Sequence, residues 1–230
     1  MSDWRISAAS VGVLVLCGVF VYTMLQSSRF EKEFAAYDAL ATAHEAAAYL
    51  PGSSNNPVRQ DLNRLLSEVL VQGLSAHDRL ALADQGLEQL ANLEKQIDAI
   101  GEAGEKVDAA VARMQVDSVG TVSSSIATHE LLTLAKKRSA IIADIRGLSY
   151  RANFETKKIF DRVIADKGAL TKEHVLDLNE QIPIVEEQFN RRSDLYAELQ
   201  SISQEIREKT TGANEGFSIT LSPLKGQVAK

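Results

Sequence analysis

Residues 93–114 decide the fold class of this chain, and they read LEKQIDAIGEAGEKVDAAVARM. Apolar or small residues recur there after alternating steps of four and three positions, at Leu93, Ile97, Ile100, Gly104, Val107, Val111 and Met114. This alternation puts the side chains on one narrow stripe of an α-helix, which is the seam of a coiled coil or a helical bundle. The stretch therefore predicts a long amphipathic helix that packs against other helices.

The same spacing recurs along the rest of the chain. It runs through residues 30–48, 134–152 and 175–199. The chain has 6% aromatic residues and four prolines in 230 residues, a composition that suits long helices better than sheets. We therefore predict an all-α fold in which amphipathic helices bury their stripes against one another.

Three polar residues, His44, Arg138 and Arg192, interrupt these stripes. Such residues either fix the register of a bundle or extend their polar ends into water. We expect the second, because long side chains commonly lie along apolar surface with the polar end solvated.

Loop and turn residues set the predicted helix boundaries. The strongest break is PGSSNNP at Pro51–Pro57, and Gly212 is the expected end of the last helix. The helices are then expected at 29–50 with 58–72, 76–118, 122–167 and 171–211. The last three are each roughly 40–46 residues long, and the first two together match that length if they run in line across the loop. Matched lengths and short turns predict an elongated antiparallel bundle of four helices; the alternative is that 58–72 folds back as a separate hairpin.

The only long apolar run is Ile6–Leu25, which contains no charged residue. A helix of this length spans roughly 30 Å, the thickness of the hydrocarbon core of a bilayer. Trp4, Arg5 and Tyr22 lie near its two ends, and we expect them at the membrane–water interface. We predict a single transmembrane helix that is retained and continues into the bundle. A cleaved signal peptide fits less well, because the run is long and no small-x-small cleavage motif follows it.

The chain thus divides into an anchor at 1–28, a helical bundle domain at 29–211 and a flexible or strand-like tail at 212–230. Lysine and arginine counts on the two flanks of the apolar run do not decide its orientation. A short head followed by a large domain is typical of a signal-anchor. We therefore expect a single-pass inner-membrane protein whose bulk is periplasmic or otherwise extracytoplasmic.

The tail departs from the helical spacing. Phe217, Ile219 and Leu221 alternate with small polar residues, which is the period of a strand. Such a segment either frays as a chain terminus or adds as a strand to the sheet edge of a partner. The three apolar residues are therefore candidate partner-binding residues.

Motifs for chemistry are absent from the sequence. None of the four histidines, His44, His77, His129 and His174, follows a glutamate at the spacing of a di-iron site. There is no zinc-protease motif, phosphate-binding loop or dinucleotide-binding loop. We therefore expect no enzymatic activity, no metal site and no cofactor. A net charge of −6 spread over mixed acidic and basic residues also argues against binding to nucleic acid.

Two functions fit this organisation. The leading hypothesis is a non-catalytic scaffold or interaction protein of a cell-envelope complex, held in the lipid bilayer by one helix and bound to a protein partner or to further copies of itself. The alternative comes from architecture: a transmembrane helix that enters a helical bundle directly resembles the extracytoplasmic ligand domains of chemoreceptors and sensor kinases. That resemblance covers roughly residues 6–211 and implies a sensory module that signals through a partner.

Overall fold

In the computed structural model the described residues are 19, 21–22, 29, 32–53, 55–118 and 125–221. A helical segment at 32–49 is followed by the 3-10 turn η1 (Leu50–Gly52) and by the α-helices α2 (Pro57–Val69), α3 (Ala76–Ser118), α4 (Ser125–Ala165) and α5 (Lys172–Leu221). No strand occurs in these ranges. The predicted all-α class is therefore confirmed for the part of the chain that the structure describes.

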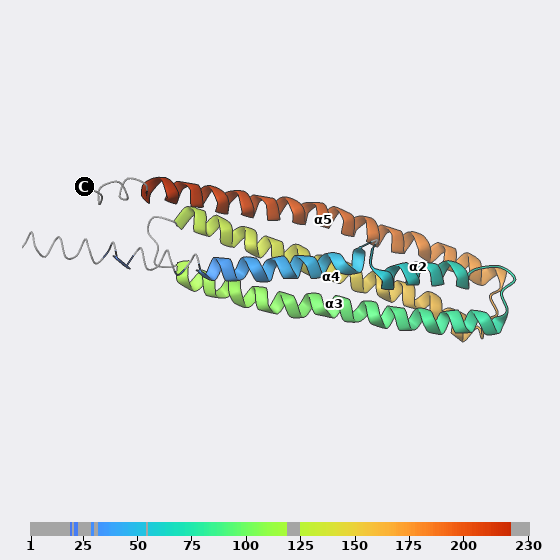
Figure 1. Cartoon of the computed structure of the whole chain (residues 1–230). Helices are drawn as coiled ribbons and strands as arrows, with labels where there is room; N and C mark the ends of the chain where they lie inside the picture. Colours follow the sequence, from blue (N-terminus) through green and yellow to red (C-terminus); the bar gives the residue numbers. More distant parts are fainter. Residues whose placement is uncertain are drawn as a thin grey trace, which may run out of the picture.

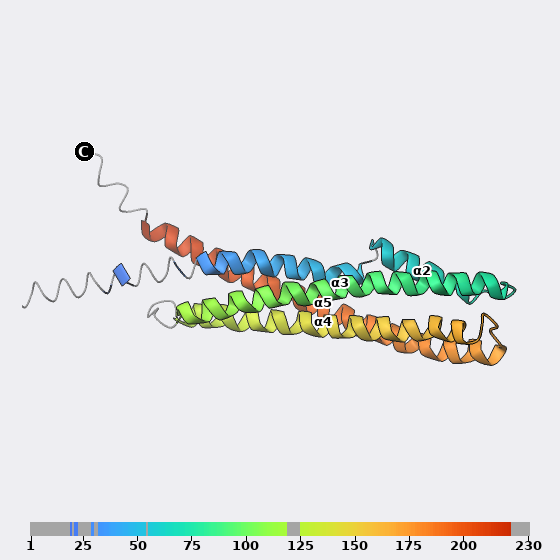
Figure 2. The same ribbon diagram turned by 90° about the horizontal axis from the view of Figure 1, so that it is seen from below.

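The helices lie side by side as an elongated bundle with antiparallel neighbours (Figure 1 and Figure 2). The segment 32–49 and α2 run in line and together form one of its four long members. This member runs antiparallel to α3, so its earlier residues contact later residues of α3. Tyr37 shares a buried cluster with Val111, and Leu65 shares another with Leu90. The in-line arrangement is therefore the one adopted, and the separate hairpin is not formed.

Asn56 stabilises the break between the two in-line helices. Its Oδ1 accepts a hydrogen bond from the backbone N–H of Val58 at 3.1 Å, which caps the N-terminus of α2. Its Nδ2 donates to Leu50 O at 3.0 Å and to Gln96 Oε1 of α3 at 2.7 Å. One buried side chain thus joins both sides of the break to the neighbouring helix, so the interruption has a fixed geometry.

The packing of α3 against α4 depends on a glycine inside α3. A β-carbon added at Gly86 would lie 2.3 Å from Cζ of Phe160, a ring that is completely buried. The ring therefore lies directly on the backbone of α3. This close approach explains a glycine in a helix interior, where it costs about 1 kcal/mol relative to alanine.

The end of α5 differs from the prediction. The helix continues past Gly212 to Leu221, so the backbone over 216–221 is helical and the predicted strand-like conformation there was wrong. A lone strand leaves its backbone N–H and C=O groups without hydrogen-bond partners, whereas a helix pairs them within the segment. Alternation over so few residues was too weak a signal to outweigh that difference.

Among the residues that the structure describes, no helix combines the length and the apolar character needed to cross a bilayer. The predicted anchor Ile6–Leu25 lies almost wholly outside those residues. Only Val19, Val21 and Tyr22 of that run are described, and each is helical and about half exposed.

Candidate functional site

The residues singled out from the sequence do not form a common site in the described structure. Trp4 and Arg5 lie outside the described residues, and Tyr22 is 54% exposed. Phe217, Ile219 and Leu221 lie on the last turns of α5, where the backbone is described but the side chains are not. Their predicted roles at a membrane surface and at a partner's sheet edge are therefore not tested.

A small cavity lies where the first helix is broken. Its volume is about 40 Å³, and its wall includes residues from η1, α2, α3, α4 and α5. The charged side chains in this wall, among the described residues, are Arg59 of α2 and Arg192 of α5. The polar neighbours are Asn63 of α2 and Ser149, Asn153 and Thr156 of α4. The lining thus combines apolar side chains with polar ones and two cationic ones.

Arg192 is 5% exposed, which is unusual for an arginine. Its Nη1 donates a hydrogen bond to Ser149 Oγ at 3.4 Å, and its Cζ lies 6.0 Å from the ring centroid of Tyr196. Burial lowers the pKa of Arg192, Tyr196 opposes that shift, and the positive charge of Arg59 adds to it. The two guanidinium groups are therefore close enough to repel each other.

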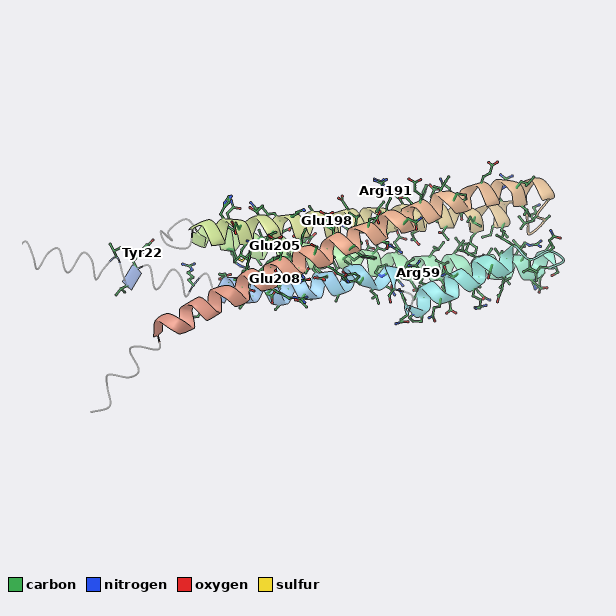
Figure 3. The ribbon with its side chains drawn as sticks, turned by 90° about the horizontal axis from the view of Figure 1, so that it is seen from above. Tyr22, Arg59, Arg191, Glu198, Glu205 and Glu208 are labelled. Atoms are coloured by element: carbon green, nitrogen blue, oxygen red, sulfur yellow. The ribbon has the colours of Figure 1, made fainter. Side chains whose placement is uncertain are left out.

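Arg59 lies in the first turn of α2, beside the break (Figure 3). Its Nη1 donates to the backbone carbonyl of Gly52 in η1. Burial also lowers the pKa of Arg59. The break in the helix is what brings this side chain to the same cavity as Arg192.

Gly52 permits η1 to lie close to α5. A β-carbon at this position would lie 2.5 Å from Tyr196 Oη and 3.2 Å from Arg192 Cζ. The Tyr196 hydroxyl donates to Ala48 O at 2.9 Å, so it cannot move without losing that bond. A larger residue at 52 would therefore displace the groups that form the cationic side of the cavity.

A second buried polar group lies between the segment 32–49, α4 and α5. Arg138 Nη2 forms an ion pair with Glu45 Oε2 and donates to Ala41 O at 3.2 Å. Glu45 Oε2 also accepts from Ser203 Oγ at 2.8 Å. These contacts join three helices through charged or polar groups inside the bundle.

The expectation that the polar residues on the stripes extend into water was wrong. His44, Arg138 and Arg192 are 4%, 4% and 5% exposed. Each stripe faces neighbouring helices on more than one side, so a polar side chain on it has no short path to solvent. These residues lie among other helices inside the bundle instead, which favours the register role that the sequence left as the other possibility.

His44 packs against Gly104 of α3, where an added β-carbon would lie 3.2 Å from Nε2. Burial is the main cause that lowers the pKa of His44. Asp108 opposes the shift, Arg138 adds to it, and a backbone hydrogen bond involving Ile100 opposes it. The imidazole is therefore neutral at neutral pH.

Acidification is expected to destabilise the bundle through His44. The unfolded chain binds a proton near the usual value of 6.5, while the folded chain binds it only at lower pH. Between these two values the unfolded state holds more protons, so stability is complete above about pH 6.5 and falls as the pH drops towards the folded pKa. We expect His44→Gln to flatten this slope in thermal unfolding followed by circular dichroism. His77→Gln, at an exposed position, is the control and should keep the wild-type slope.

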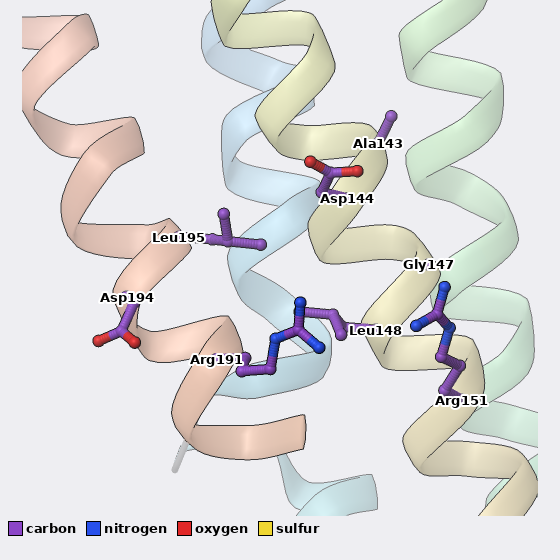
Figure 4. Close-up of a pocket in the computed structure, with 8 residues that line it drawn as sticks. All are labelled: Ala143, Asp144, Gly147, Leu148, Arg151, Arg191, Asp194 and Leu195. Atoms are coloured by element: carbon purple, nitrogen blue, oxygen red, sulfur yellow. The ribbon is translucent and has the colours of Figure 1, made fainter. Parts of the chain in front are cut away.

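A larger groove lies outside the bundle, between α4 and α5 (Figure 4). Its volume is about 360 Å³, and its lining includes Asp144, Arg151, Arg191 and Asp194. The opposite charges of these side chains balance, so the groove favours neither anions nor cations. It is a less specific candidate than the cavity at the helix break.

The described residues contain no group of three or more histidine, cysteine, aspartate or glutamate side chains placed to hold a metal ion. Comparison of the chain with protein-family models, with curated proteins and with solved structures finds no match.

Proposed function

We propose that the protein is a non-catalytic, membrane-anchored interaction or scaffold component of a cell-envelope complex. The apolar run Ile6–Leu25 supports the anchor, because it is long enough to cross a bilayer and directly precedes the bundle. Helices of 43, 41 and 50 residues support an extended stalk, since helices of this length span roughly 60–75 Å.

The observation that most directly supports partner binding is an apolar groove at the turn between α2 and α3. This turn lies at the end of the bundle opposite to the start of the segment 32–49 (Figure 1). The groove has a volume of about 430 Å³ and is lined by Glu68, Val71, Leu74, Asp78, Ala81 and Leu82. Val71 is 52% exposed there. Apolar surface with an acidic rim suits a partner segment that inserts an apolar side chain between basic residues.

Crosslinking in native membranes tests this proposal. We expect one protein to be captured in defined stoichiometry, and we expect Val71→Lys to abolish the capture. Phe154→Lys, at a 59% exposed apolar position in α4, is the matched control and should leave it unchanged. Equal capture by the Val71→Lys and Phe154→Lys variants would show that the groove does not bind the partner. Absence of any stoichiometric partner would contradict the interaction role, and protease accessibility in the same membranes tests the topology.

A chain that ends at Gly212 tests the tail in the same assay. Loss of the captured protein in that variant alone would place the contact at the end of α5, where Phe217, Ile219 and Leu221 lie.

A ligand-binding sensory module is the second candidate function. The two arginines at the helix break, Arg192 buried and Arg59 partly buried, favour it, since a scaffold needs no cationic cavity. The signal would then pass to a partner.

A further inference from the structure

We propose that the cavity at the helix break binds a small monocarboxylate, with its carboxylate held by Arg59 and Arg192. The site does not depend on the membrane anchor or on the partner proposed above. It gives the sensory candidate a ligand class.

The chemistry of the wall favours an anionic ligand. Two guanidinium groups reach the cavity from different helices, Arg59 from α2 and Arg192 from α5. A guanidinium presents N–H donors in a planar fork that matches the two oxygens of a carboxylate. These two arginines are the charged side chains that line the described part of the wall. The ligand class that such a wall attracts is therefore an anion.

The electrostatics of the two arginines also favour a bound anion. Burial of the two side chains lowers the pKa of each, and the charge of Arg59 lowers the pKa of Arg192 further. Both effects penalise the charged forms. A bound anion between the two groups would offset their repulsion and part of the cost of burial.

The size and polarity of the cavity favour a small carboxylate. A water molecule needs about 10–15 Å³ of cavity volume. A cavity of about 40 Å³ therefore admits a carboxylate with a short chain and excludes a sugar phosphate or a nucleotide. The lining also includes Leu62, Leu93 and Ile97, all buried. A lining that is partly apolar and partly cationic suits an anion with a short alkyl tail, such as acetate or propionate.

The wall also contains a polar side chain whose hydrogen bonding is incomplete. Asn153 Oδ1 is buried and accepts no hydrogen bond from any residue that the structure describes. Buried polar atoms are nearly always satisfied, by the protein or by something bound to it. A water molecule that accompanies the carboxylate can donate to this oxygen.

The full chain purified in detergent provides the test. Sodium acetate and sodium propionate are titrated at constant ionic strength, and binding is measured by calorimetry and by saturation transfer to the ligand methyl group. Sodium chloride controls for anion class, and acetamide, which has the shape of acetate without its charge, controls for charge. We expect saturable binding of the two carboxylates and none of acetamide.

Variants locate the site. Arg59→Gln is expected to weaken binding about tenfold or more, because a hydrogen bond to a charged group is lost. Arg192→Gln should weaken binding to a similar extent. If this more deeply buried substitution unfolds the protein, Arg59→Gln alone provides the test. Arg191→Gln is the matched control, since Arg191 is exposed on α5 (Figure 3) and does not line the cavity.

Three results would overturn the inference. They are the absence of saturable carboxylate binding, an equal response to chloride and acetate, and an equal loss of binding in Arg59→Gln and Arg191→Gln. Partner capture in the crosslinking assay is measured on the same variants. A failure of carboxylate binding with intact partner capture would leave the interaction role standing.

Discussion

Replacing Glu45 with leucine is expected to lower the free energy of unfolding by about 3–5 kcal/mol. The substitution leaves the Arg138 guanidinium inside the bundle without the carboxylate that neutralises it. The side chain of Arg138 is 5% exposed and that of Glu45 14%, so water cannot take over the role of the lost partner. Ser203 loses the acceptor of its hydrogen bond as well. Urea unfolding of the full chain in detergent, followed by circular dichroism, measures the loss.

The double variant Glu45→Leu/Arg138→Leu separates pairing from packing. Removing both charges leaves no uncompensated ion, so we expect this variant to be more stable than Glu45→Leu alone. If the two side chains contributed only packing, the losses of stability from the two substitutions would add instead.

An exposed ion pair supplies the control. Lys137 Nζ lies 3.0 Å from Glu198 Oε1, with side chains 55% and 45% exposed. It joins α4 and α5, the helices that carry Arg138 and Ser203. Because exposed pairs contribute at most about 1 kcal/mol, Glu198→Leu should change stability little. A loss in Glu45→Leu no larger than that in Glu198→Leu would show that the buried pair is not needed for stability.

The helix boundaries were largely predictable, because they depend on local residue types. The prediction of 76–118 coincides with α3. The prediction of 122–167 extends past the end of α4 at Ala165, and its first residues, 122–124, lie outside the described residues. The turn after α4 shows why: Lys167 has φ of 52° and Gly168 has φ of 75°, in the left-handed region that ends helices. Such signals act within a few residues and can be read from one stretch of sequence.

The candidate site was not predictable in the same way. The stripe of each helix can be read from its own spacing, but which side chain of another helix meets it depends on how four helices are rotated against one another. Glu45 does not lie on the stripe of its helix, so nothing in its position identified it as the partner of Arg138. The cavity has a further requirement, because it exists only where the break after Tyr49 and the close contact of Gly52 with Tyr196 bring Arg59 towards Arg192.

Replacing Arg79 with methionine is expected to open the end of the bundle that carries the α2–α3 and α4–α5 turns. Arg79 is 8% exposed, and its guanidinium donates to Val69 O at 3.0 Å, to Val71 O at 3.0 Å and to Gly168 O at 2.7 Å. One side chain therefore joins the end of α2 to both turns. Loss of three hydrogen bonds from a charged donor is expected to cost about 2–4 kcal/mol. Arg79→Lys should restore little, since an ammonium group cannot reach three acceptors that a planar fork spans.

Hydrogen exchange distinguishes a local opening from a global loss. We expect faster exchange of the backbone amides at 69–75 and 166–171 in Arg79→Met, with little change at Ile141–Ile145 in the centre of α4, because local unfolding at a bundle end need not involve the core. Arg64→Met is the control: Arg64 pairs with Glu68 at 2.8 Å but is 51% exposed, so its removal should have little effect. Gly168 also packs tightly against Ala76, since a β-carbon added at Gly168 would lie 2.3 Å from the Ala76 carbonyl oxygen. Unchanged exchange at both turns in Arg79→Met would mean that this packing is sufficient to hold the end of the bundle closed.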